Sequence, residues 1–139
     1  MEFIKVIISK WLPYKKFTAM TIIPFIIIRK ENLYKYTEKV KRHEYIHAMQ
    51  QLECFVMSMI IILIMLVLSL HWYCLIPIGL FYEIYGLEFL VKLLLCGFDF
   101  DKAYKSVSFE QEAYKNQSNP LWLEFRPSFY WVRYITALS

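Results

Sequence analysis

Hydrophobic positions are concentrated in the middle of the chain rather than spread along it. Residues 54–70 read CFVMSMIIILIMLVLSL, a run of 17 residues without a charge. A helix of about this length reaches the lower limit for crossing the roughly 30 Å hydrocarbon core of a bilayer. A small soluble protein has little room to surround a helix that is apolar on every side, so a membrane span is favoured over a buried core helix.

A second apolar stretch follows and is interrupted by Glu83, Glu88 and Lys92. The two stretches predict membrane spans over about residues 53–71 and 73–97, joined by a short turn. Charged side chains are costly inside a bilayer. Glu88 and Lys92 are spaced i, i+4 and are expected to form a structural pair, and Glu83 is expected to face the helix pair or a polar cavity. The pattern therefore predicts a two-span helical hairpin.

The segments on either side of the apolar stretches predict smaller elements. Thr18–Arg29 is rich in β-branched residues and contains Pro24, which favours one strand or a small hairpin; a re-entrant membrane segment is the alternative. Thr37 is a suitable N-cap for a helix without Gly or Pro that begins at Glu38 and continues into the first span. Residues 101–116 predict another helix, and the aromatic tail that follows suits an interfacial position. The expected fold class is a mainly α membrane protein: a two-span helical hairpin with a small N-terminal strand or hairpin and cytoplasmic or interfacial helices.

Composition and charge support this class. Apolar residues make up 58% of the 139 residues and charged residues 20%, which excludes disordered and collagen-like chains and disfavours an ordinary soluble globule. Ten of the 16 Lys and Arg precede the first span and the expected turn has none, so both termini are expected in the cytoplasm, at a bacterial inner membrane. The net charge of +4 is explained by anionic lipid, without a nucleic-acid partner. One domain over residues 1–139 is expected.

The chemistry-bearing motif is HEYIH, which runs from His43 through Glu44 to His47. In a helix, the two histidines of an HExxH pattern project from one face and can reach the same Zn²⁺ ion. The glutamate between them is not a ligand, but it can take a proton from a zinc-bound water and pass it to a leaving group. A solvated helix face without metal is the alternative interpretation.

A third ligand is required, because two histidines leave a zinc site incomplete. The second span should return the sequence Ser108-Phe109-Glu110-Gln111-Glu112 to the side of the membrane that carries the motif. Glu110 and Glu112 lie on different faces of a helix, so we expect only one of them to bind the metal. Residue types alone leave that choice open.

These motifs together resemble gluzincin-type HExxH zinc metallopeptidases, and more closely the integral-membrane peptidases of the HtpX/Ste24 (M48-like) type. In that family the third ligand opens an E-x-x-A-D helix, and Glu110 to Ala113 match its first four positions. The resemblance implies that Glu110 is the third ligand, and Glu112 remains the alternative. The family's aspartate is replaced here by Tyr114, and the matched motifs cover less than a fifth of the chain.

The hypothesis from the sequence is a Zn²⁺-dependent membrane metallopeptidase. Glu44 would be the catalytic base, His43, His47 and Glu110 the ligands, and a peptide or membrane protein the substrate. A homodimer is compatible with this hypothesis, because two spans alone enclose little space. A non-catalytic metal-binding membrane adaptor or degenerate peptidase is the alternative; a di-iron desaturase is disfavoured, since such proteins need more than the 3 histidines present.

Overall fold

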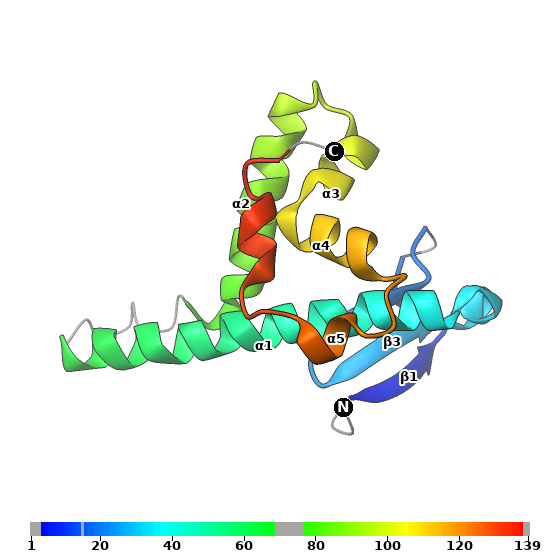
Figure 1. Cartoon of the computed structure of the whole chain (residues 1–139), viewed down its shortest axis with the longest axis horizontal. Helices are drawn as coiled ribbons and strands as arrows, with labels where there is room; N and C mark the ends of the chain where they lie inside the picture. Colours follow the sequence, from blue (N-terminus) through cyan, green and yellow to red (C-terminus); the bar gives the residue numbers. More distant parts are fainter. Residues whose placement is uncertain (1–3, 15, 69–76, 138–139) are drawn as a thin grey trace. The chain divides into compact units, whose positions relative to one another are not determined.

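The computed structural model describes residues 4–14, 16–68 and 77–137 (Figure 1). The chain separates into two compact units, one of residues 1–49 and 112–127 and the other of residues 50–111 and 128–139. Two of the three division points fall inside helices, α1 (Glu38–Val67) and α4 (Ser108–Asn116), so each of these helices contributes to both units. The expectation of one domain stays a prediction.

The first unit contains a three-stranded mixed sheet with the order β1-β3-β2. Its strands are β1 (Lys5–Ser9), β2 (Ala19–Ile22) and β3 (Phe25–Arg29). Residues 18–29, expected to form one strand or a small hairpin, form the hairpin, because β2 pairs antiparallel with β3 around a turn that contains Pro24. Strand β1, which pairs parallel with β3, was not predicted.

One face of this sheet packs against the N-terminal half of α1. Ile26 and Ile28 of β3 are fully buried and form a cluster with Ala48 of α1, against which Val40 and Tyr45 also pack. A 3-10 helix, η1 (Lys30–Lys35), connects the sheet to α1. The sheet therefore fixes the part of α1 that carries the HExxH motif.

The second unit combines the rest of α1 with α2 (Leu80–Leu95), α3 (Phe100–Ser106), the first part of α4 and the 3-10 helix η3 (Tyr130–Tyr134). Its core is a cluster of buried residues from these elements: Cys54, Phe81, Val107, Phe109 and Trp131. A short helix, α5 (Trp122–Phe125), precedes η3 along the chain but belongs to the first unit.

The helix expected over residues 101–116 is two helices, α3 and α4, separated at Val107. The backbone of Val107 has φ −60° and ψ 134°, which is incompatible with a continuous helix. Glu88 of α2 accepts hydrogen bonds from the backbone N–H of Ser108 at 2.9 Å and from its hydroxyl at 2.6 Å. The Glu88 carboxylate therefore caps the N-terminus of α4, because it accepts the hydrogen bond of a backbone N–H in the first turn.

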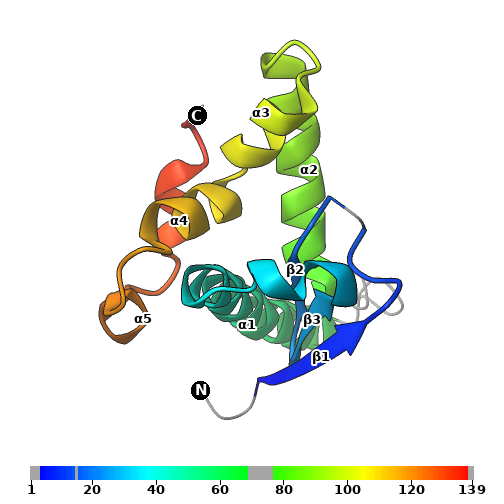
Figure 2. The same cartoon turned by 90° about the vertical axis from the view of Figure 1, so that its right-hand side faces the viewer.

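Within the described residues, only α1 is long and apolar enough to cross a membrane. Helix α2 has 16 residues, and Figures 1 and 2 show that it leads away from α1 instead of running back beside it. The expectation of a second span over residues 73–97, and with it the two-span hairpin, is therefore corrected to one candidate span. The expected turn near residues 69–73 lies outside the described residues.

The physical reason for this correction is the polar network on α2. Glu88 binds the start of α4, and Lys92 lies 3.9 Å from Glu88 and donates a hydrogen bond to the carbonyl of Ala137. Lys92 is only 3% exposed. One side of α2 is thus used for packing within the second unit.

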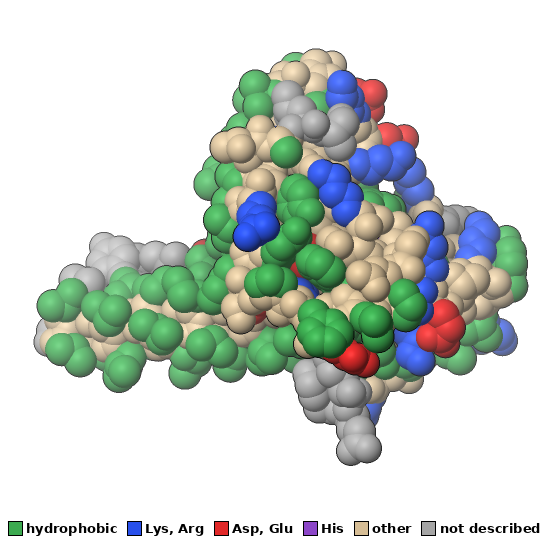
Figure 3. Space-filling view, viewed as in Figure 1, with side chains coloured by type: hydrophobic (Ala, Val, Ile, Leu, Met, Phe, Trp, Pro, Cys, Tyr) green, Lys and Arg blue, Asp and Glu red, His purple; other side chains and the backbone are tan. Residues whose placement is uncertain are grey.

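The C-terminal half of α1 exposes most of its apolar side chains. Figure 3 shows hydrophobic side chains along this part of the helix. Exposed members include Phe55, Leu63, Ile64 and Val67. Such exposure is not what a core helix of a soluble protein shows, because burying apolar surface is the main stabilising term in folding.

Candidate metal centre

The HExxH histidines lie on the first turns of α1, in the half that packs on the sheet. His43 and His47 are both buried. Their Nε2 atoms face each other at 3.0 Å, and their rings are T-shaped with centroids 4.7 Å apart. The i, i+4 spacing therefore brings two imidazole nitrogens to one point, as the sequence predicts.

Glu110 supplies a carboxylate oxygen to the same point from the first turn of α4. Ligand atoms of His43, His47 and Glu110 all lie within 4.8 Å of one another, and all three residues are buried. Among the described residues this group has the composition and spacing that could hold a metal ion. The buried His-His-Glu cluster is thus present.

Contacts between α1 and α4 occur on both sides of Glu110. The side-chain amide of Gln50 donates to the carbonyl of Phe109 at 3.1 Å, and Gln50 is fully buried. Four residues after Glu110, the ring of Tyr114 lies edge-on to His43 with centroids 4.7 Å apart. These two contacts join residues that are 59 and 71 positions apart in the sequence.

The geometry fits zinc. Two nitrogens held at 2.0–2.1 Å in a tetrahedron lie roughly 3.3 Å apart, close to the 3.0 Å between the two Nε2 atoms. Two imidazoles and one carboxylate form a ligand set typical of catalytic zinc sites, in which a fourth position stays open. The same donors also accept other divalent ions, so the cluster by itself shows a metal site and not which metal it takes.

Glu44 is positioned by the sheet. The hydroxyl of Thr21, on strand β2, lies 2.7 Å from Oε2 of Glu44 and 3.1 Å from its backbone oxygen. Both side chains are buried. Because a hydroxyl that donates to a carboxylate restricts where that carboxylate points, Thr21 orients Glu44.

Tyr85 of α2 contacts the third candidate ligand. Its hydroxyl donates a hydrogen bond to Oε1 of Glu110 at 3.0 Å. Hydrogen bonds to a ligating carboxylate fix its orientation and tune its affinity for metal. Nothing in the sequence pattern marks Tyr85 or Thr21 for these contacts, because both depend on tertiary packing.

Glu112, the alternative third ligand, makes a different contact. Its carboxylate accepts hydrogen bonds from Nε and Nη2 of Arg126, the first at 2.5 Å and the second at 3.0 Å. The two side chains are 0% and 3% exposed. Glu112 is not part of the group of candidate ligands, and its contacts are those of a buried bidentate ion pair.

Tyr36, which precedes α1, lies close to the motif and has an altered acidity. Burial raises its pKa to about 12, and Tyr45 and the carboxylates of Glu44 and Glu38 contribute in the same direction. Its hydroxyl is buried and makes no hydrogen bond within the described structure. The phenol is therefore held neutral beside the motif.

Two other polar residues serve packing within the second unit. Arg133 lies over the ring of Tyr130, 4.7 Å from its centroid. Glu53 accepts the backbone N–H of Phe129 at 2.9 Å, where the backbone has the left-handed φ of 56°. Neither residue belongs to the candidate metal group.

Comparison with models of known protein families, with curated proteins and with solved structures finds no match. The site must therefore be interpreted from its own residues and geometry.

Proposed function

We propose that this chain is a zinc-dependent metallopeptidase that is embedded in a membrane. The observation that carries the proposal is the buried group of His43, His47 and Glu110, with Glu44 adjacent to the first histidine. A glutamate at this position of the motif distinguishes hydrolytic zinc sites from structural ones, which are closed by a fourth protein ligand.

Each side chain has a role in peptide hydrolysis. A bound Zn²⁺ ion would supply Lewis-acid chemistry, lowering the pKa of a water and polarising the peptide carbonyl. Glu44 accepts the proton of the attacking water and delivers it to the leaving amine. Thr21 keeps the Glu44 carboxylate in one orientation for both transfers, and Tyr85 does the same for Glu110.

The sheet supports peptide binding close to Glu44. Among the described strands, β2 pairs with β3 alone, so its other edge can accept an extended peptide. Backbone N–H and C=O groups at a free edge bind a peptide as an added strand. Since Thr21 of β2 contacts Glu44, a peptide on this edge would pass beside the proposed base.

Helix α1 supports the membrane location. Its apolar residues are largely exposed, and ten Lys and Arg precede them in the sequence. Positively charged flanks remain on the cytoplasmic side of a span, so the motif and the N-terminal sheet would lie there. Peptides or membrane proteins exposed at that face would be the substrates.

Metal analysis and cleavage test the two parts of the proposal separately. Protein purified in detergent is expected to contain about one zinc per chain, and His43→Ala is expected to lose it. Glu44→Gln is expected to retain zinc but to lose cleavage of a quenched-fluorescent peptide library, because the base has no carboxylate. Asn116→Ala, at the far end of α4, serves as a purification control.

The outcomes distinguish the alternatives. Wild-type protein that holds no metal after purification and after incubation with zinc would overturn the proposal altogether. Zinc bound at one per chain, with wild type and Glu44→Gln equally inactive, would favour the non-catalytic metal-binding adaptor. Equal cleavage by the two proteins would contradict the role of Glu44 as the base.

A further inference from the structure

The outer face of the N-terminal sheet is apolar and uncovered by other described elements. The inner face is covered by α1 along β2 and β3, whereas Val6 and Ile8 on the inner side of the edge strand β1 are exposed. Side chains alternate between the two faces along each strand. In the observed register Ile22 and Phe25 are cross-strand partners, and Ile7 pairs with Ile27 in the neighbouring row. Ile7, Ile22 and Phe25 are 37–42% exposed.

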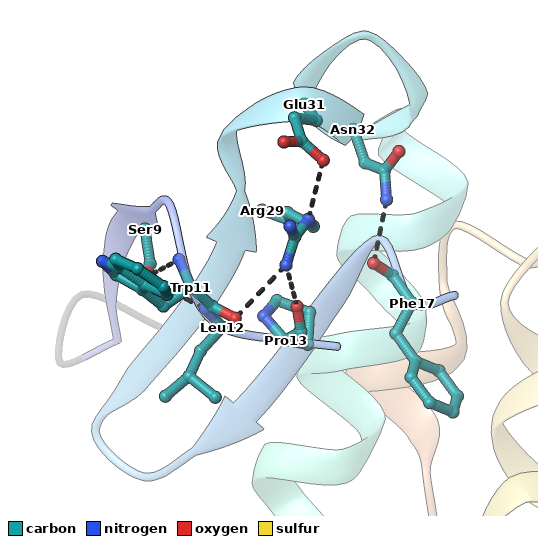
Figure 4. Close-up of polar contacts among 8 residues, drawn as sticks. All are labelled: Ser9, Trp11, Leu12, Pro13, Phe17, Arg29, Glu31 and Asn32. Carbon is teal, nitrogen blue, oxygen red and sulfur yellow. Dashed lines mark hydrogen bonds and ion pairs between the residues drawn. The ribbon is translucent and has the colours of Figure 1, made fainter. Parts of the chain in front are cut away.

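The loop between β1 and β2 extends this apolar face. Trp11 is 85% exposed, and Leu12 and Tyr14 are exposed as well. Arg29 is two residues after Ile27 on β3, so the two side chains leave the sheet on the same, outer face. It donates hydrogen bonds to the carbonyls of Trp11 and Pro13, which places the loop on this side (Figure 4).

The loop is held in a defined conformation although its side chains are exposed. Nη1 of Arg29 lies 3.2 Å from the carbonyl of Trp11 and 3.0 Å from that of Pro13. The Ser9 hydroxyl oxygen accepts the backbone N–H groups of Trp11 and Leu12, both at 3.2 Å (Figure 4). Fixing the backbone in advance reduces the entropy lost on binding, so the exposed Trp11 ring is presented ready for contact.

The positive charge of this face indicates that its partner is anionic. Residues 3–30 contain six Lys and Arg but no Asp or Glu. Lys5 shares the outer face with Ile7, and Lys10 adjoins Trp11; both lysines are exposed. Glu31, whose carboxylate lies 3.0 Å from Nε of Arg29, is an acidic neighbour of this face, so the charge of the face is net positive. A surface that combines an exposed Trp and aliphatic side chains with net positive charge matches the headgroup region of an anionic bilayer.

We propose that this face, formed by Ile7, Trp11, Leu12, Tyr14, Ile22 and Phe25, docks on the anionic surface of a lipid bilayer. Trp11 enters the interface, and Lys5 and Lys10 bind the headgroups. The docking is a membrane contact separate from the apolar half of α1, and it does not depend on the presence of the metal or on peptidase activity.

Tryptophan quenching tests the proposal in the full-length protein. The chain is reconstituted in nanodiscs of phosphatidylcholine, with or without phosphatidylglycerol, in which the acyl chains are brominated. The signal of Trp11 is obtained as wild type minus Trp11→Phe, since the hydrogen bonds by which Trp11 holds the described loop are made by its backbone N–H and carbonyl, which Phe retains. In anionic discs this signal is expected to be quenched by the brominated lipid and protected from acrylamide.

Lysine variants test the charge contribution. Removing Lys5 or Lys10 by substitution with Gln is expected to lower the ratio of docked to undocked Trp11 about fivefold per lysine. Lys102→Gln is the matched control, because Lys102 is an exposed lysine on α3, outside the proposed face. Equal effects of all three substitutions would overturn the role of this face.

Two other results would overturn the proposal. Acrylamide could quench the Trp11 signal in anionic discs as strongly as in detergent, which would show a water-exposed loop. The signal could instead be protected from both quenchers while cross-linking shows paired chains, which would identify a second copy of this chain as the occupant. Zinc content measured on the same samples keeps these results independent of the proposed function.

Discussion

The hydroxyl of Thr21 lies 2.7 Å from Oε2 of Glu44, joining strand β2 to the glutamate of the HExxH motif. Hydrogen bonds to charged groups contribute about 1.5–3 kcal/mol. We expect Thr21→Val, which conserves shape but removes the donor, to lower the free energy of unfolding by about that amount. The loss is measured by chemical denaturation in detergent, on chains with a full complement of zinc.

Thr21→Ser is the matched control, since it retains the hydroxyl. If Thr21 orients Glu44 for catalysis, peptide cleavage by Thr21→Val should show a lower kcat with little change in KM, and Thr21→Ser should recover most of the rate. Equal kcat values in wild type and Thr21→Val would contradict the positioning role.

Replacement by Gln should reduce zinc binding at Glu110 but not at Glu112. Glu110→Gln removes a candidate metal ligand and should therefore bind zinc far more weakly than wild type. Glu112→Gln alters the ion pair with Arg126 and should retain about one zinc per chain, as wild type is expected to do. Zinc retention by Glu110→Gln together with zinc loss from Glu112→Gln would reverse the assignment.

We expect the Arg126–Glu112 pair to affect the free energy of unfolding rather than zinc binding. Breaking a buried ion pair by removing one partner costs about 3–5 kcal/mol, because the other charge stays buried. Arg126→Met is therefore expected to destabilise the protein strongly, and the double variant Arg126→Met/Glu112→Met should recover most of the loss. The denaturation midpoints of wild type, the single variant and the double variant test this expectation. A double variant that is less stable than Arg126→Met would contradict the role of the ion pair.

Metal removal should lower thermal stability through the same cluster. A ligand that binds only the folded state at a thousand times its Kd stabilises it by about 4 kcal/mol. Addition of a chelator should therefore lower the Tm of wild type but leave that of His47→Ala unchanged. A similar decrease in both proteins would indicate that the chelator acts elsewhere.

Tyr36 should make stability sensitive to high pH. Its pKa is raised from 10.0 to about 12 in the folded chain, because burial disfavours the phenolate. Between pH 10 and 12 the phenol therefore ionises more readily in the unfolded chain, and the free energy of unfolding decreases as the pH rises through this interval. Tyr36→Phe should show a shallower loss of stability over this interval, measured as the change in denaturation midpoint with pH.

Tyr34→Phe provides the comparison for that measurement. Tyr34 is 78% exposed on η1, so its removal leaves the buried phenol of Tyr36 in place. At neutral pH, Tyr36→Phe should not reduce stability, since the buried hydroxyl makes no hydrogen bond within the described structure. If the denaturation midpoints of Tyr36→Phe and wild type changed equally with pH, the assignment of this pH dependence to Tyr36 would be contradicted.

Local patterns in the sequence predicted the elements that depend on neighbours in the chain. The HExxH spacing needs only a helix to bring His43 and His47 together, and α1 provides it. The β2–β3 hairpin likewise follows from β-branched residues around Pro24. The resemblance to a known family pointed to Glu110, which the structure places with the two histidines.

Features that depend on distant residues were not predictable in the same way. Strand β1 pairs parallel with β3, about 20 positions away, and its five residues carry no signal strong enough to show it. Helix α2 was interpreted as a span because its apolar residues outnumber its charges, but Glu88 and Lys92 are used within the second unit. The Thr21–Glu44 contact arises only when the sheet packs on α1.

The continuity of α1 has a consequence for which peptide bonds can be reached. His47 precedes the apolar run at Cys54 by seven residues of unbroken helix, a rise of about 10 Å. If that run enters a bilayer, the fixed length of this helical segment determines the distance of the metal-binding histidines from the hydrocarbon. Under the proposed peptidase function, a peptide bond would then be selected by its distance from the membrane as well as by the side chains around it.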